Sequence, residues 1–471
     1  MRLDTPPHDH SIREKKPMEF YDTVIVGAGP SGMMAANELS STTNLSILVL
    51  EKGKEIRERS CKLSSGNKCA NCEPCDVVNG VGGAGLFSDG KLCLSNAVGE
   101  RLKGISGKFT PSVVSCLDDL LRDKGIIKPK PSKAFRRMEK LARPLGFNFE
   151  CYNVRGMGSE NARLVVSELE KKIQENNVVI SPNSNVLDLQ QLTDKRWVVR
   201  FQKGGSNDAV SCRFLLIAVG RSGAKWFMKQ TRKLNIETEP RPFYLGIRVE
   251  TPKEIMNPLT RLSYNPKLSL GRKGETYIKT HCFCEGGFVI TYSYNKTRFV
   301  GGLSDHQRNT SFSILVEHHT PQNQNTYEYS HYICYLLNQI GNGKVILQTL
   351  KDFRKSKASI KRSIELNAVQ PTLKDFSLRD ISSIFPESVI SLIIDFIDRM
   401  NTICPGVDNE STLLYAPSLE WCVDRFPVNA NMETERKNLY AIGDGSGTTQ
   451  GIIAAAATGM IAGKDIAIKI Q

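Results

Sequence analysis

The sequence has no apolar run of the roughly 18 residues that a membrane-spanning helix needs. The most apolar candidate, residues 452–463, is rich in Ala and Gly, so we expect a buried helix there. Residues 1–17 lack the apolar centre of a secretory signal. We therefore expect no membrane span, a cytoplasmic location, and a disordered tail over residues 1–21.

Other signals are missing as well. The chain has no internal repeat and a single GxGxxG-type motif, so we expect no dedicated NAD(P)H domain. The net charge of +14 is concentrated at residues 128–143 and 351–362, but neither stretch interleaves aromatic residues as a nucleic-acid stacking surface does. Solvated surface is the favoured interpretation, phosphate or RNA binding is the alternative, and a nucleic-acid partner is not expected.

What the sequence does contain is a dinucleotide-binding fingerprint. Residues 21–32 read YDTVIVGAGPSG, and a second apolar run ends in Glu51 about twenty residues later. Gly27 allows the tight turn after the first strand, Gly29 lets the backbone approach a pyrophosphate, and Gly32 lets the next helix pack closely. The helix N-terminus then faces the phosphates, and Glu51 accepts hydrogen bonds from a ribose.

C-terminal signals distinguish between dinucleotides. Residues 438–444 form an apolar strand that ends in Gly-Asp, and a loop leads from it into the helix at 452–463. FAD proteins of the glutathione reductase class hold flavin oxygens with such a pair and direct the next helix N-terminus at the flavin. Residues 214–220 resemble the strand that lies beside FAD in these folds. The three motifs in this order predict FAD rather than NAD.

Four of the 13 cysteines lie close together, at Cys61, Cys69, Cys72 and Cys75. In a cytosolic chain, this spacing suits thiolates that share a zinc ion or an iron–sulfur cluster. Redox-active thiols beside the flavin, or no chemistry, are the alternatives. Cys282 and Cys284 alternate along an expected strand, where buried free cysteines are the favoured interpretation.

The glycine-rich stretch 80–91 follows the cysteine loop directly. Four glycines within six residues indicate backbone that passes close to a ligand, for which the flavin ring and pyrophosphate are the best candidates. Ser88, Asp89 and Lys91 are placed to hydrogen-bond the ring edge or a substrate.

A family resemblance rests on VGAGPSG, the cysteine loop, GVGGAGLFSDGKL, LLYAPSLEW (413–421) and NLYAIGDGSGTTQGI (438–452). With these stretches the chain resembles the uncharacterised FAD-dependent dehydrogenases of bacteria and archaea, which are NAD(P)/FAD-dependent oxidoreductases of the glutathione reductase type. The likeness extends over most of the chain from Asp22 onward. It implies an FAD domain interrupted by a substrate domain, but no particular substrate. Gln450 departs from the basic or small residue expected there.

Periodicity predicts the same organisation. We expect an α/β fold in which an FAD-binding Rossmann-like domain, made of a parallel sheet with helices and a hairpin, is interrupted by an α+β substrate domain with an antiparallel sheet. The FAD-binding domain is expected at residues 22–100, 155–239 and 425–471, a helical insertion at 101–154, and the substrate domain at 240–424.

Candidate site residues follow from these motifs. His281 and Glu420 are candidate proton carriers, and Arg425 is a candidate clamp for a substrate carboxylate or phosphate. For each residue a structural role is the favoured interpretation: His281 as a satisfied strand residue, and Glu420 and Arg425 as ion-paired with each other or with neighbours. The residues predicted to bind FAD are Gly27, Gly29, Pro30, Ser31, Gly32, Glu51, Lys52, Gly82, Gly83, Gly85, Ser88, Asp89, Val186, Gly220, Gly443, Asp444, Gly451 and Ile452.

The favoured function is an FAD-dependent oxidoreductase that transfers hydride between a non-covalently bound flavin and a small organic substrate. The candidate electron sources are the substrate itself, NAD(P)H and a redox protein partner. Two alternatives stay open. One is an electron-transfer flavoprotein with an iron–sulfur cluster on the four cysteines, and the other is an RNA-modifying flavoprotein, suggested by the net charge.

Overall fold

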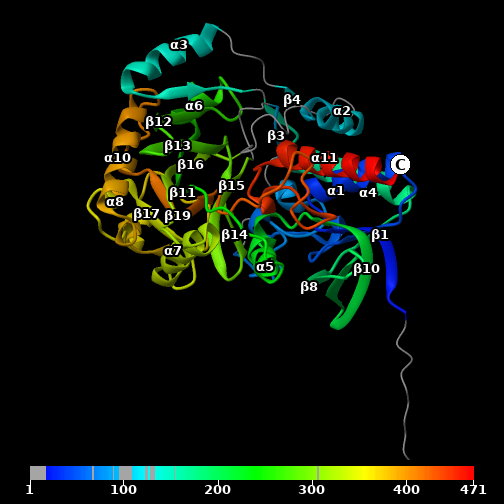
Figure 1. Cartoon of the computed structure of the whole chain (residues 1–471). Coiled ribbons are helices and arrows are strands. Elements are labelled where there is room, and N and C mark those ends of the chain that lie inside the picture. The colour runs from blue at the N-terminus through cyan, green and yellow to red at the C-terminus, as the bar shows by residue number, and fades with distance from the viewer. Residues whose placement is uncertain are drawn as a thin grey trace, which may run out of the picture.

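The structure is a computed structural model, which describes residues 17–65, 68–87, 90–94, 109–121, 126–127, 133–152, 154–304 and 307–471. Two large sheets, each with its own helices, make up most of the molecule (Figure 1). Within the described residues, none of the helices combines the length and apolar character needed to cross a membrane.

The first sheet carries the fingerprint and is parallel at its centre, in the order β7-β2-β1-β10-β20. These strands are β1 (Glu19–Val26), β2 (Ile47–Leu50), β7 (Val178–Ser181), β10 (Ser206–Ile217) and β20 (Leu439–Ala441). All four residues of β2 are buried, as expected for a strand covered on both faces. β1 begins at Glu19, inside the stretch for which the sequence predicted a tail.

A hairpin extends this sheet. β9 (Trp197–Lys203) pairs antiparallel with the first half of β10 and with β8 (Ser184–Gln191), whereas β20 pairs with the last residues of β10. The predicted α/β fold with a hairpin is therefore confirmed.

Helices α1 (Pro30–Thr42), α4 (Gly158–Glu175) and α11 (Ile452–Ile470) cover the first sheet, and α11 lies along α1 (Figure 1). The small residues of α11 explain this closeness. A Cβ on Gly459 would lie 2.0 Å from the carbonyl oxygen of Ser31, so only glycine allows the two backbones to approach this far. Helix α5 (Gly220–Lys233) follows β10.

The second sheet is mainly antiparallel, in the order β18-β17-β19-β11-β16-β13-β12-β5. Its strands are β5 (Asn148–Glu150), β11 (Phe243–Pro252), β12 (Lys267–Gly271), β13 (Tyr277–Cys284), β16 (Asn309–His318), β17 (Ile346–Thr349), β18 (Ser377–Leu378) and β19 (Leu413–Glu420). A separate hairpin joins β14 (Phe288–Tyr294) to β15 (Thr297–Leu303). The helices of this part are α6 (Lys253–Thr260), α7 (Thr326–Ile340), α8 (Leu350–Phe353), α9 (Lys361–Glu365) and α10 (Glu387–Asn401).

The region predicted as a helical insertion also contributes strands. Its helices α2 (Thr110–Leu121) and α3 (Lys133–Ala142) are present, but β5 joins the edge of the second sheet beside β12. A small sheet forms from β3 (Lys91–Cys93), β4 (Ile126–Ile127) and β6 (Val154–Gly156). The insertion thus packs on both parts of the molecule, because β5 pairs with β12 and α2 contacts α4 and α11.

Candidate functional site

A cavity of about 780 Å³ is lined by residues that follow the strands of the first sheet and by residues of β12, β13 and β19 in the second. This volume lies within the range of about 300 to 1,000 Å³ that is usual for ligand-binding pockets. The fingerprint and the candidate proton carriers therefore share one cavity.

The three fingerprint glycines differ in the space around them. Gly27 has φ +109°, and a Cβ there would lie 2.4 Å from the carbonyl oxygen of Ala218. A Cβ on Gly32 would lie 2.0 Å from the carbonyl oxygen of Gly27, so this glycine sets the approach of α1 to β1. A Cβ on Gly29 would meet nothing closer than 3.9 Å. Gly29 lines the cavity, so that space is available to a ligand.

Three helix N-termini open onto the cavity. Helices α1, α5 and α11 begin after Gly29, Val219 and Gly451, and none of these capping positions makes a side-chain hydrogen bond to the helix. All three residues line the cavity. Free backbone N–H groups and the positive ends of helix dipoles attract anions, so the residues present fit the diphosphate of a dinucleotide.

Glu51 is buried and holds the backbone around the fingerprint. Its carboxylate accepts hydrogen bonds from the backbone N–H groups of Ala28, Gly53 and Gly80, each at 2.9 Å. An ionised carboxylate has about four acceptor positions, so about one remains for a ribose hydroxyl. Glu51 therefore orders the loop as well as lining the cavity.

Asp444 stands at the start of the segment that leads from β20 into α11. It accepts hydrogen bonds from Thr449 Oγ1 at 3.1 Å and from the Gly451 backbone N–H at 3.3 Å. Burial raises the pKa of Asp444 to about 6, although the nearby Arg221 guanidinium acts in the opposite direction. Asp444 thereby fixes the N-terminus of α11 at the cavity wall.

A compact charged cluster lies at the end of β19. Glu420 Oε1 is 2.7 Å from both His281 Nε2 and Gln450 Nε2, and Glu420 Oε2 is 2.6 Å from Lys279 Nζ. Lys279 and Glu420 are buried, whereas the His281 side chain is 27% exposed. His281 is therefore the member of the cluster with the most access to the cavity.

The cluster shifts the proton affinities of its members. Burial alone raises the pKa of Glu420, but the charges of His281 and Lys279 outweigh it and hold this pKa well below its ordinary value. Burial lowers the pKa of Lys279 to about 8, against the attraction of Glu420. Glu420 thus stays ionised, and Lys279 is poised to titrate near neutral pH. Shifts of this kind are common at functional sites.

A bulge in β13 brings two neighbouring side chains to the cavity. The pairing of β13 with β16 shifts by one residue between His281 and Cys284, and Cys282 has φ +51°. In a regular strand, His281 and Cys282 would point to opposite faces. Here both line the cavity. The sequence favoured two buried cysteines at 282 and 284, but only Cys284 has that position.

Most of the predicted cofactor residues line the cavity, namely Gly27, Gly29, Pro30, Ser31, Glu51, Lys52, Gly83, Gly85, Val186, Gly220, Asp444, Gly451 and Ile452. Gly32, Gly82 and Gly443 do not line it. Each lies where a side chain would collide with a neighbour, and a Cβ on Gly443 would lie 2.4 Å from Ser31 Oγ. Ser88 and Asp89 fall outside the described residues.

Arg425 does not line the cavity, in contrast to its predicted role as a clamp. Its backbone bridges Glu239, and its guanidinium Nη2 lies 3.0 Å from Glu239 Oε1. Glu420 and Arg425 do not pair with each other, but each forms an ion pair with other neighbours, which is one form of their structural alternative. Arg425 therefore links the segment that follows α5 to the segment between β19 and β20.

The cysteine loop forms a wall of the cavity. The buried Arg59 donates hydrogen bonds to the carbonyl oxygens of Asp76, Val81 and Gly83, and so ties this loop to the glycine-rich stretch. In the part of the chain that the structure describes, no three His, Cys, Asp or Glu side chains come together as a metal site requires. The four-cysteine site predicted at Cys61, Cys69, Cys72 and Cys75 is therefore not assembled in this structure.

Sequence reasoning missed Lys279 and Lys267. A usable signal existed for Lys279, because residues two apart in a strand share a face, and Lys279 therefore accompanies His281. Lys267 opens β12, and its neighbourhood depends on the pairing of strands that are far apart in sequence.

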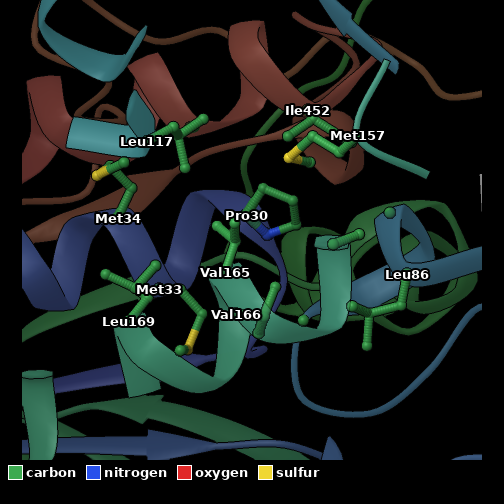
Figure 2. A pocket seen from close by; sticks show the side chains of 14 residues that line it. Pro30, Met33, Met34, Leu86, Leu117, Met157, Val165, Val166, Leu169 and Ile452 are labelled. Atoms are coloured by element: carbon green, nitrogen blue, oxygen red, sulfur yellow. The ribbon is translucent and has the colours of Figure 1, made fainter. Parts of the chain in front are cut away.

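A second, smaller pocket of about 50 Å³ adjoins the first between α1, α4 and α11 (Figure 2). Met33 of α1, Val166 of α4 and Ile452 of α11 point toward it. Its side chains are all apolar, and it is too small for any part of a dinucleotide. It belongs to the packing between the helices.

Three family models match parts of the chain. "FAD-dependent protein, C-terminal domain-like" matches residues 242–419, "NAD(P)-binding Rossmann-like domain" matches residues 25–60, and "Glucose inhibited division protein A" matches residues 391–471. A search of curated proteins finds no match.

Similar solved structures are distant in sequence. Glycine oxidase from Geobacillus kaustophilus is 11% identical, with 96% of this chain and 95% of that chain covered and a TM-score of 0.40. A flavoprotein/dehydrogenase from Cytophaga hutchinsonii is 10% identical, with 96% and 78% covered and a TM-score of 0.37. The p-nitrophenol 4-monooxygenase from Pseudomonas putida is 11% identical, with 96% and 80% covered and a TM-score of 0.41.

The fingerprint, the cavity and the matched FAD-dependent and Rossmann-like models define the class of this protein as the FAD-dependent oxidoreductases. It is an enzyme of that class with FAD as its cofactor.

Proposed function

We propose that this oxidoreductase transfers hydride between a non-covalently bound flavin and a small organic substrate, with the cluster of His281, Glu420 and Lys279 carrying the proton. One observation supports this most directly. The cluster lines the same cavity as the fingerprint, and Gln450, next to the N-terminus of α11, bonds to Glu420 at 2.7 Å. We also propose the glutathione reductase type of domain arrangement, in which the chain returns to the first sheet after the second.

FAD supplies the hydride acceptor or donor when bound, and the protein supplies orientation and proton transfer. Glu420 Oε1 accepts the hydrogen bond from His281 Nε2, so Nε2 carries a proton and is not free for a substrate. Nδ1 is then the nitrogen that takes up a substrate proton. Lys279 neutralises Glu420 and keeps the carboxylate from competing for that proton.

The test begins with the visible absorption spectrum of protein purified without oxygen. A two-band flavin spectrum is expected. His281→Gln and Glu420→Gln are then compared with the wild type by stopped-flow reduction of the flavin with a panel of small alcohols, amines and hydroxy acids. We expect each variant to slow reduction by about 10² to 10⁴.

Photochemical reduction of the flavin serves as the control, because it needs no proton carrier for a substrate and should be equally complete in all three proteins. Protein that cannot be reconstituted with FAD would contradict the assignment of the cofactor. Unchanged substrate reduction in both variants would contradict the role of the cluster.

The two alternatives have less support. An electron-transfer role through a cluster depends on the cysteines at 61–75, which do not converge among the described residues. An RNA-modifying role depends on the net charge, and no residue of α3 or of 351–362 lines the cavity.

A further inference from the structure

The part of the cavity formed by β12 and β13 carries an excess of positive charge. Lys267, Lys279 and His281 line it, and Glu420 is the carboxylate that faces them. Lys279 and His281 are both held by Glu420, at 2.6 and 2.7 Å. Glu420 is a single carboxylate, and despite its burial His281, Lys279 and Lys267 together hold its pKa low, so the positive groups outnumber it.

Among the residues that the structure describes, Lys267 forms no ion pair within 4.0 Å, and its charge acts on Glu420 from a longer distance. Glu150 lies opposite Lys267 in the pairing of β12 with β5, but its side chain is exposed and bonds to Asn148 instead. The Lys267 ammonium lies 5.2 Å from the centre of the Tyr152 ring. A lysine that is partly withdrawn from water favours an anionic partner, and the aromatic ring provides only part of that stabilisation.

Tyr152 adds a neutral donor at the same place. Asn265 Nδ2 donates to the Tyr152 hydroxyl at 2.7 Å, and Asn265 is itself oriented by the Phe283 backbone N–H, which donates to Asn265 Oδ1 at 3.3 Å. The Tyr152 oxygen is thus used as an acceptor, and its O–H remains to donate. Burial raises the pKa of Tyr152 well above its ordinary value, so the phenol stays protonated. The Cys93 thiol also hydrogen-bonds to Tyr152, but a thiol is a weak acceptor, so a carboxylate would compete successfully for this O–H.

We propose that the substrate of this enzyme carries a carboxylate, which binds to the ammonium of Lys267 and the hydroxyl of Tyr152 at the wall formed by β12. This inference rests on the proposed function, because it names the class of substrate for the same cavity. One ammonium and one phenol O–H match the two oxygens of a carboxylate. The cavity must also hold FAD, so the acid is small.

The test uses the FAD-loaded protein and three small acids, benzoate, acetate and succinate, each beside its neutral amide. Binding is followed through the change in the visible spectrum of the oxidised flavin. We expect at least one acid to bind saturably, and its amide to bind about tenfold more weakly or worse, since the amide lacks the charge.

Three variants locate the site. Lys267→Gln should weaken binding of the acid by about tenfold or more, and Tyr152→Phe should weaken it less, because the ring under Lys267 is kept. The control is Lys273→Gln, at an exposed lysine that also lies over a tyrosine ring but does not line the cavity. It should bind the acid as the wild type does.

The inference is overturned if no acid binds better than its amide, or if Lys267→Gln binds the acid as tightly as Lys273→Gln does. A failure of the proposed function has a different signature. If the protein shows no flavin spectrum, the proposed function is contradicted before any acid is added. If the protein binds flavin but none of the acids, only this inference is contradicted.

Discussion

At the scale of single residues, two glycines of the fingerprint have different roles, one in stability and one in FAD binding. Gly27 has a positive φ and packs against the Ala218 carbonyl, whereas Gly29 has extended backbone and open space beside it. We expect Gly27→Ala to destabilise the protein by about 2 to 4 kcal/mol, because both the backbone angle and the contact oppose a side chain. Thermal unfolding without added FAD measures this.

Gly29→Ala should leave that unfolding temperature nearly unchanged and weaken FAD binding by about tenfold or more, because its methyl group would occupy the space for a phosphate. Titration with FAD measures the affinity. Equal effects of the two substitutions on stability would contradict this division of roles.

His331 predicts how stability depends on pH. It is buried against Tyr327, with ring centres 3.7 Å apart, and burial lowers its pKa to about 3. Above about pH 6.5 the ring is neutral in both folded and unfolded protein. Between about pH 6.5 and 3, only the unfolded state takes up the proton, so stability falls as pH falls.

His331→Phe removes this proton uptake and keeps an aromatic ring beside Tyr327. Between about pH 7.5 and pH 5, the variant should gain about 2 kcal/mol of unfolding free energy relative to the wild type. Urea unfolding at the two pH values measures the difference. His319→Gln, at a side chain that is 53% exposed, should show no such gain. A parallel loss of stability in wild type and His331→Phe would contradict the argument.

Short sequence motifs predicted those residues whose roles depend on neighbouring positions in the chain. Glu51 follows from its distance to the fingerprint, and His281 and Glu420 follow from their residue types near expected flavin-binding segments. Arg425 forms an ion pair with a neighbour, as its structural alternative allowed, but local patterns could not name the partner, because Glu239 comes from a distant part of the chain. Lys267 was missed for the same reason, since its surroundings exist only once β12 pairs with β5 and β13.

At the scale of elements, the packing of α11 on α1 depends on glycine. With the helices in their present positions, the methyl carbon of Gly459→Ala would lie 2.0 Å from the Ser31 carbonyl oxygen. The helices must therefore separate. Because Ser31 lies in the first turn of α1 and lines the cavity, we expect both lower stability, by about 2 kcal/mol or more, and weaker FAD binding.

Calorimetry and FAD titration measure the two effects. The matched control is Ile468→Ala on the same helix, because that side chain is 70% exposed and should change neither quantity. A Gly459→Ala protein with wild-type stability would show that the two helices do not require this approach.

Periodicity predicted long elements well: the apolar pattern predicts helices near 326–340 and 386–400, and α7 and α10 lie within one residue of these ranges. It did not predict β5, a strand of three residues whose partner comes far later in the chain. Nor did it predict the bulge in β13, which depends on how β16 pairs with it. Both features lie near the end of the cavity that the second sheet lines, so the site was less predictable than the fold.

At the scale of the whole molecule, the cavity joins parts that the chain sequence separates. The first sheet supplies the fingerprint and the helix N-termini, and the second supplies Lys267, Lys279, His281 and Glu420. The fold class was predictable because each sheet has its own local pattern. The meeting of the two sheets was not, since it depends on which faces pack together.

This shared cavity predicts that FAD stabilises both sheets as one unit. At a free FAD concentration of about 100 times its dissociation constant, binding adds about 2.7 kcal/mol to the free energy of unfolding. For a chain of 471 residues, that corresponds to an increase in the melting temperature of roughly 3 °C. Calorimetry should show one endotherm that moves as a whole, and Gly29→Ala should move less at the same FAD concentration. Two endotherms, of which FAD shifts only one, would mean that the second sheet contributes little to the binding energy of FAD.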